Sequence, residues 1–382
     1  MLAFDNTKIS YKHLSNKDLR LKKRLFKILK STPFSGMCSK TLLHFLTHNY
    51  PVLGFYKGLI LKNFWVGNNV EDFKEKAEKI WQQGVYSAPL YMPKANEDSS
   101  EVYNEYLRMI KFVSKLPYVP IIPIQFSHLI SPRVLKLVAA QTLLNKSDQK
   151  LWDTFQAQID TLCELIIAKD IRVLFEAETP EIQPAVEAIA FRLMKLYNTH
   201  RSMVNLTYSF LNNISFNKLT QNHRTLVHEK ITPGYGLAGG IFWETGNINT
   251  SRNESLSELT HQSKETNSAI KYLLTNIESC SLISLTHNID RVLYLTSLMD
   301  SQKIAKNDNR SITMQYMGLA DHISFNLANS GFNVVKIIPY GCPKETSILI
   351  IRQFLGISYL DELIRTELKL TKKEIARRAK EI

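Results

Sequence analysis

Eight short apolar segments, separated by longer stretches with helical spacing, limit the folds open to this sequence more than any other feature. Most of these segments are apolar at consecutive positions rather than at alternate ones. Strands that are buried on both faces, as in parallel sheets, have this composition. We therefore expect strands at residues 84–91, 119–126, 172–176, 203–209, 236–243, 281–286, 312–317 and 334–338.

Helical patterns fill the intervals between the expected strands. Apolar residues recur every three or four positions within 101–115, 148–168, 181–197, 264–277 and 290–299. Strand–helix alternation repeated eight times predicts the α/β class and a (β/α)8 barrel of the TIM type, with a doubly wound open sheet as the structural alternative. We divide the chain into an N-terminal helical arm at 1–80, the barrel at 81–358 and a basic helical tail at 359–382.

The composition excludes several classes of protein. A chain of 382 residues that is 44% hydrophobic can bury a sizeable core and is not disordered. Its four cysteines are scattered without a CxxC pair, which indicates reduced thiols in a cytoplasmic protein. The sequence contains no apolar run of about 18 residues, and its N-terminus lacks the order of a secretory signal, so we expect neither a spanning helix nor export.

The net charge of +13 is concentrated at the two ends of the chain, in segments 20–30 and 369–380. The simplest interpretation is that both segments are solvated helix faces. The alternative is a peripheral contact with the anionic inner face of the cell membrane. Few aromatic residues interleave with these cations, so nucleic acid is not an expected partner.

In a barrel of this kind the site lies at the C-terminal ends of the strands. Glu176 and Glu178 close the third strand and are expected to point into the mouth, where two close carboxylates raise one pKa. The alternative is that Arg352 or Lys336 neutralises them structurally. His287 follows the sixth strand but has no second ligand nearby, so no metal site is expected.

Residues 234–239 read G-Y-G-L-A-G and so match the GxGxxG pattern of dinucleotide-binding folds. That motif requires a strand before it and a helix after it. Here the glycines run on into an apolar segment that we expect to be the fifth strand. We therefore interpret the pattern as part of a strand rather than as a nucleotide site.

Several motifs together resemble those of the flavin-dependent proline dehydrogenase family. Residues 286–288 read T-H-N, residues 314–325 read M-Q-Y-M-G-L-A-D-H-I-S-F, and residues 335–341 read V-K-I-I-P-Y-G. Residues 175–178 read F-E-A-E, similar to the family's D-A-E, and residues 4–7 resemble the opening of bacterial members. The resemblance runs nearly from end to end and is specific as a set.

This resemblance implies a chemistry and a set of site residues. The family oxidises L-proline to 1-pyrroline-5-carboxylate, passes a hydride to FAD, and delivers electrons to a quinone at the membrane. A small amino-acid-like substrate is therefore expected. The resemblance assigns catalytic roles to Arg352, Glu176 and Tyr340, and FAD binding to Gln315, His287, Asn288 and Lys336.

The sequence departs from the family where the chemistry lies. Gln125 stands in place of a lysine, and the fifth strand, 235–241, lacks the family's two basic residues and its tyrosine. Ser209 replaces a glutamine, and Arg352 is one arginine where the family has two. We therefore expect impaired proline oxidation. A pseudoenzyme serving as a binding or regulatory scaffold, and an enzyme of other chemistry that uses Glu176, Glu178 and His287, remain as alternatives.

Overall fold

A computed structural model describes residues 2–31, 54–210, 216–238, 256–356 and 360–381. Within these ranges eight parallel strands form one sheet in the order β1-β8-β7-β6-β5-β4-β3-β2. The strands are β1 (Tyr86–Met92), β2 (Ile121–Ile124), β3 (Arg172–Phe175), β4 (Val204–Ser209), β5 (Gly234–Ala238), β6 (Ser281–Leu285), β7 (Ser311–Tyr316) and β8 (Val334–Gly341). All eight lie at the expected places, although the predicted end of the fifth, 239–243, falls outside the described residues.

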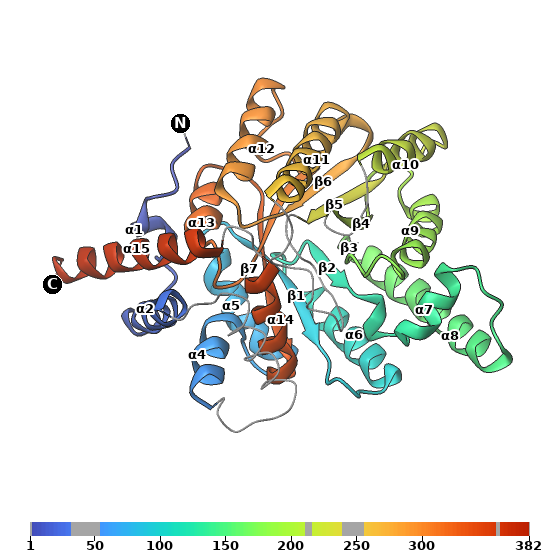
Figure 1. Cartoon of the computed structure of the whole chain (residues 1–382), viewed down its shortest axis with the longest axis horizontal. Helices are drawn as coiled ribbons and strands as arrows, with labels where there is room; N and C mark the ends of the chain where they lie inside the picture. The colour runs from blue at the N-terminus through green and yellow to red at the C-terminus, as the bar shows by residue number, and fades with distance from the viewer. Residues whose placement is uncertain (1, 32–53, 211–215, 239–255, 357–359, 382) are drawn as a thin grey trace.

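The strands at the two ends of this order, β1 and β2, also lie next to each other. The backbone N–H of Ser87 in β1 donates a hydrogen bond of 2.9 Å to the carbonyl oxygen of Tyr118, just before β2. The sheet therefore curves into a nearly closed barrel with helices around it (Figure 1). This confirms the (β/α)8 class and excludes the doubly wound open sheet.

Side chains along each strand alternate between the barrel interior and the surrounding helices. In β3, Leu174 belongs to the interior cluster, whereas Val173 and Phe175 pack in the outer layer. In β7, Met314 and Tyr316 face the interior. Both faces are buried, which explains why the strands are apolar at consecutive positions.

Amphipathic helices cover the outside of the barrel. In the first of them all five residues of the expected apolar stripe are buried, and Asp98 caps its N-terminus by accepting a hydrogen bond from the Ser100 N–H. These helices are α6 (Ser99–Val113), α7 (Pro132–Ala139), α8 (Lys146–Ile167), α9 (Gln183–Tyr197), α10 (Phe216–His228), α11 (Leu256–Thr275), α12 (Ile289–Ser301) and α13 (Asp321–Asn329).

Further helices precede β1 and follow β8. They are α1 (Thr7–Ser10), α2 (Asn16–Ser31), α4 (Gly54–Phe64), α5 (Val70–Trp81), α14 (Pro343–Gly356) and α15 (Leu360–Ala379). Phe26 of α2, Leu59 of α4 and Leu349 of α14 join the interior cluster. The Trp65 indole N–H, just after α4, donates to the Gly341 carbonyl oxygen at 3.1 Å. Helices α2, α4 and α14 therefore border the barrel at its C-terminal end.

The two ends of the chain pack against each other, because α15 lies along α2 (Figure 1). The guanidinium of Arg378 donates to the carbonyl oxygens of Tyr11 and Leu14 at 2.8 and 2.9 Å, and Arg377 pairs with Glu374 at 2.8 Å. Lys22 is buried, not solvated as the charge pattern suggested. Part of the positive charge at both ends is thus neutralised within the chain.

The glycines of the GxGxxG pattern have a packing role in β5. A Cβ atom at Gly234 would collide with the Asn205 side chain of β4, and one at Gly236 would lie 2.5 Å from the Thr207 hydroxyl oxygen. The neighbouring strand approaches so closely that only glycine fits at these two positions. Both lie inside a strand, so the dinucleotide interpretation is excluded for the described part of the motif.

Candidate active site

Three side chains from different strands meet at the C-terminal end of the barrel. Glu176 directly follows β3 on the same face as the interior residue Leu174, and Tyr316 ends β7 on the interior side. The Glu176 carboxylate lies close enough to Tyr316 to raise the pKa of the phenol, although burial is the larger cause. His287, two residues beyond β6, stacks beside Tyr316 with ring centroids 6.0 Å apart.

His287 is held as a neutral imidazole. Its Nε2 accepts a hydrogen bond of 3.1 Å from the Tyr316 backbone N–H, which assigns the ring proton to Nδ1. Burial lowers the pKa of His287 to about 3, and nearby Lys336 lowers it further. The ring is therefore a buried, uncharged N–H donor at neutral pH.

The second carboxylate, Glu178, is hydrogen-bonded to the segment after β2. Its Oε1 accepts the Ser127 N–H at 2.9 Å, while its own backbone N–H donates to Gln183 Oε1 at 2.9 Å. Burial raises the pKa of Glu178 to about 7, and hydrogen bonds from Ser127 and Gln125 oppose this increase. Glu178 is thus a buried carboxyl group that titrates near neutrality, with burial rather than a second carboxylate as the main cause.

The structure does not bring Gln315 to the barrel interior. Gln315 lies between Met314 and Tyr316, whose side chains face the interior. Because side chains alternate along a strand, the Gln315 side chain faces the outer layer. There its Nε2 donates to the Thr286 carbonyl oxygen at 2.8 Å, and its Oε1 accepts from the Ser324 hydroxyl of α13. The expected contact with FAD is not supported by this placement, because Gln315 joins β6 and β7 to α13 instead.

Lys336 is also turned outward, because Val335 and Ile337 on either side of it face the interior. Its ammonium lies 3.0 Å from Asp321 Oδ1 and donates to the carbonyl oxygens of Tyr316 and Leu319 at 3.2 and 2.5 Å. The ion pair of Lys336 is with Asp321 and not with Glu176, and its role in FAD binding stays a prediction. The lysine is bound in a buried charge cluster on the outer face of β8.

That buried charge cluster joins both ends of the chain to the barrel. The ammonium of Lys22 in α2 lies 2.8 Å from Asp321 Oδ2 and 3.1 Å from Glu367 Oε2 of α15. The His322 ring lies 3.3 Å from the same Glu367 carboxylate. Two lysines face two carboxylates, so the cluster is balanced in charge, as a buried ion network must be.

The remaining predicted residues are dispersed. The Tyr340 ring packs outward against Tyr91, with centroids 5.4 Å apart, and lies near Glu105 of α6, which does not support contact with a substrate in the mouth. Asn288 caps α12, since its Oδ1 accepts the Arg291 N–H at 3.0 Å. Arg352 belongs to α14, but its side chain lies outside the described residues.

Sequence reasoning missed Tyr316 as a residue of the mouth. The strand period places Tyr316 on the same face as Met314, but it does not identify that face as the interior one. The Tyr316 and His287 rings are nearly parallel and buried, and buried Gln125 adds an amide at the end of β2. These residues fit the uncharged, planar part of a flavin, whereas the described ends of β2 to β7 contain no lysine or arginine that faces inward.

The described residues also bear on metal binding and on the crossing of a membrane. Within the described ranges, no group of three or more His, Cys, Asp or Glu residues is arranged to hold a metal ion. The described helices are each too short or too polar to cross a membrane. From the placements described above, the candidate site consists of five residues at the C-terminal end of the barrel: Gln125, Glu176, Glu178, His287 and Tyr316.

Comparison with known proteins agrees with this architecture. The family model described as proline dehydrogenase matches residues 73–355. The chain is 21% identical over 358 residues to the carbapenem antibiotics biosynthesis protein CarD of Pectobacterium carotovorum subsp. carotovorum, covering 90% of this chain and 94% of that protein. It is 25% identical over 247 residues to the mitochondrial proline dehydrogenase 1 of Caenorhabditis elegans, covering 62% of this chain but only 40% of the relative.

The fold also matches crystal structures. Proline utilization A (PutA) of Bdellovibrio bacteriovorus, inactivated by N-propargylglycine, superposes with a TM-score of 0.66 at 13% identity and covers 91% of this chain and 38% of that protein. PutA of Bradyrhizobium japonicum gives a TM-score of 0.60 at 15% identity over 83% of this chain and 34% of that protein. The family match over residues 73–355 is the stronger finding. The chain therefore belongs to the proline dehydrogenase family.

Proposed function

We propose that this protein is an FAD-dependent oxidoreductase that converts L-proline, or a closely related cyclic amino acid, to the 1-pyrroline-5-carboxylate type of product. The observation that carries the proposal is the joint position of Glu176, Tyr316 and His287 at the C-terminal mouth of a proline-dehydrogenase-family barrel. FAD, when bound, would supply the hydride acceptor, and a quinone is the expected final electron acceptor. Tyr316, His287 and Gln125 are the described residues that would hold the flat ring.

An amino-acid substrate enters as a zwitterion, and the mouth offers a partner for its positive end. The buried Glu176 carboxylate attracts the substrate ammonium, because opposite charges interact strongly where water is excluded. Glu178, with a pKa of about 7, can accept a proton from the substrate nitrogen near neutral pH. Arg352 remains the proposed partner of the substrate carboxylate.

We propose further that proline turnover is low. Gln125 ends β2 where the family has a lysine, and it donates to the Ser127 hydroxyl at 3.0 Å rather than supplying a cation. A charge-assisted hydrogen bond is worth about 1.5–3 kcal/mol, and each 1.36 kcal/mol of transition-state stabilisation is about tenfold in rate. Several such interactions are missing relative to the family, so a loss of orders of magnitude is expected.

The visible spectrum of the purified protein tests this proposal. The expected result is a flavin spectrum, either as isolated or after incubation with FAD, that bleaches slowly when L-proline is added without oxygen. Glu176→Gln should keep the flavin spectrum but slow the bleaching, because it removes the negative charge that binds the substrate ammonium. Failure to retain any FAD would contradict the proposal and would favour a scaffold without catalysis.

A further inference from the structure

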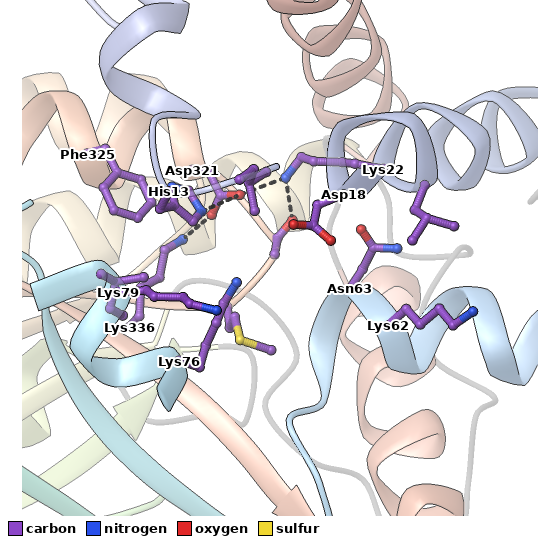
Figure 2. A pocket seen from close by; sticks show the side chains of 15 residues that line it. His13, Asp18, Lys22, Lys62, Asn63, Lys76, Lys79, Asp321, Phe325 and Lys336 are labelled. Atoms are coloured by element: carbon purple, nitrogen blue, oxygen red, sulfur yellow. Dashed lines mark hydrogen bonds and ion pairs between the residues drawn. The ribbon is translucent and has the colours of Figure 1, made fainter. Parts of the chain in front are cut away.

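A cavity of about 200 Å³ lies on the outer side of β7 and β8, next to the C-terminal end of β7 (Figure 2). It is bordered by α5, α2, the α1–α2 connection and the turn between β7 and α13. Lys62 and Lys79 at its edge are exposed, so the cavity opens to solvent there. Its volume is enough for a small anion with a few water molecules, since one water occupies about 30 Å³.

Lysines outnumber the acidic residues in the wall of the cavity. Five lysines contribute to its wall, and no arginine does so among the described residues: Lys22, Lys62, Lys76, Lys79 and Lys336. Two acidic residues share this wall, and each already has hydrogen-bonding partners. Asp321 lies between Lys22 and Lys336, and Asp18 accepts hydrogen bonds from the Ser15 N–H and hydroxyl at 3.0 and 2.7 Å.

Lys76 is the cation in excess. Its half-buried side chain extends from α5 into the cavity (Figure 2), and within the described residues it forms no ion pair or hydrogen bond. Burial is the main reason that the pKa of Lys76 is lowered. Attraction to Asp321 and Asp18 opposes this effect, and repulsion from Lys22 and Lys79 adds to it. An anion beside the ammonium would relieve both the lost hydration and the repulsion.

His13 adds a second, independent feature. Its side chain is only 3% exposed, and its ring stacks on Phe325 with centroids 4.1 Å apart. Nε2 lies 4.0 Å from Asp321 Oδ2, while Nδ1 is buried without a hydrogen-bond partner in the described part of the chain. A buried ring nitrogen without a partner is costly unless a ligand satisfies it.

We propose that this cavity binds a small, multiply charged oxyanion of the phosphate type, held by Lys76 and by His13 Nδ1 with Lys62 at the entrance. The ammonium of Lys79, also at the entrance, is paired with Glu75 at 2.6 Å. Lysine can hold such a ligand because its ammonium acts as a point charge toward phosphate. The site lies behind β8, and its occupation does not depend on the function proposed for the mouth.

Calorimetric titration of the full-length protein with inorganic phosphate, at constant ionic strength against chloride, tests the proposal. We expect saturable binding to one site, about tenfold weaker or more in Lys76→Gln, because a charge-assisted contact is lost. His13→Phe keeps the stacking on Phe325, removes both ring nitrogens and should also weaken binding. Circular dichroism and the unfolding temperature confirm that each variant is folded.

Lys74→Gln is the matched control. Lys74 lies on the same helix as Lys76 but outside the cavity, where it is 50% exposed and 3.6 Å from Glu78. Its replacement removes the same charge and should leave phosphate binding unchanged. Two results would overturn the proposal: no saturable phosphate binding by the wild-type protein, or equal weakening in Lys74→Gln and Lys76→Gln.

Discussion

The ammonium of Lys336 lies 3.0 Å from the carboxylate of Asp321, on the outer face of the barrel and not in its mouth. Lys22 reaches the other oxygen of the same carboxylate at 2.8 Å, so one aspartate joins the N-terminal helix α2 to strand β8. The lysine that resemblance assigns to FAD therefore has a structural partner. The charge pair explains why a strand that is otherwise apolar on both faces carries a lysine.

Replacing Asp321 with asparagine should destabilise the protein by about 3–5 kcal/mol, because two buried lysines lose their shared counter-ion. Urea unfolding at pH 7 measures the change in the free energy of unfolding. Asp153→Asn, at an exposed position of α8, is the control and should lie within about 0.5 kcal/mol of wild type. Equal effects of the two substitutions would show that the cluster does not stabilise the fold.

Glu178 should make stability depend on pH near neutrality. Its pKa is about 7 in the folded protein against an ordinary value of 4.5, so the folded state binds the proton more tightly. The stability from this group is complete below about pH 4.5 and is lost as the pH rises through 7. As the pH rises from 4.5 to 8, the free energy of unfolding of Glu178→Gln should therefore increase relative to that of the wild type by up to about 3 kcal/mol.

Urea unfolding of both proteins at pH 4.5, 6 and 8 measures this difference. Glu164→Gln, at an exposed position of α8, should show no such trend. A stability difference between Glu178→Gln and wild type that stays constant across these pH values would mean that Glu178 ionises freely in the folded protein.

Gln125→Lys should raise kcat/KM for L-proline at least about tenfold, because it restores one charge-assisted donor at the end of β2. The control is Gln125→Met, which is similar in volume but adds no charge and should not raise the rate. Anaerobic reduction of the FAD-loaded protein by proline is the measurement. If the lysine variant is no faster than wild type, the missing cation at this position does not limit the reaction.

Arg378→Ala should lower stability by about 1–3 kcal/mol. The guanidinium donates to the carbonyl oxygens of Tyr11 and Leu14, and these acceptors would lose a charged partner. Arg365→Ala, at an exposed position of the same helix, should change the free energy of unfolding by less than about 0.5 kcal/mol. Comparable losses in both variants would indicate a general effect of charge on α15.

The barrel itself could be predicted from the sequence. Runs such as 121–124, apolar at each successive position, predict strands buried on both faces, and the 3.6-residue stripe of α6 predicts its buried side. The positions of Glu176, Glu178 and His287 at strand ends could also be predicted from the sequence, because parallel strands end at the same side of a barrel. These features depend on local periodicity and chain order alone.

Only the tertiary structure decided which way Gln315 and Lys336 point. A strand buried on both faces has the same apolar pattern whichever face is interior, so periodicity relates Gln315 to Tyr316 without saying which one faces the mouth. The burial of Lys22 among basic neighbours depends on Asp321 and Glu367, which lie about 300 residues or more away in the chain. Contacts between such distant residues have no periodic trace in the sequence, and so the folded chain alone determines them.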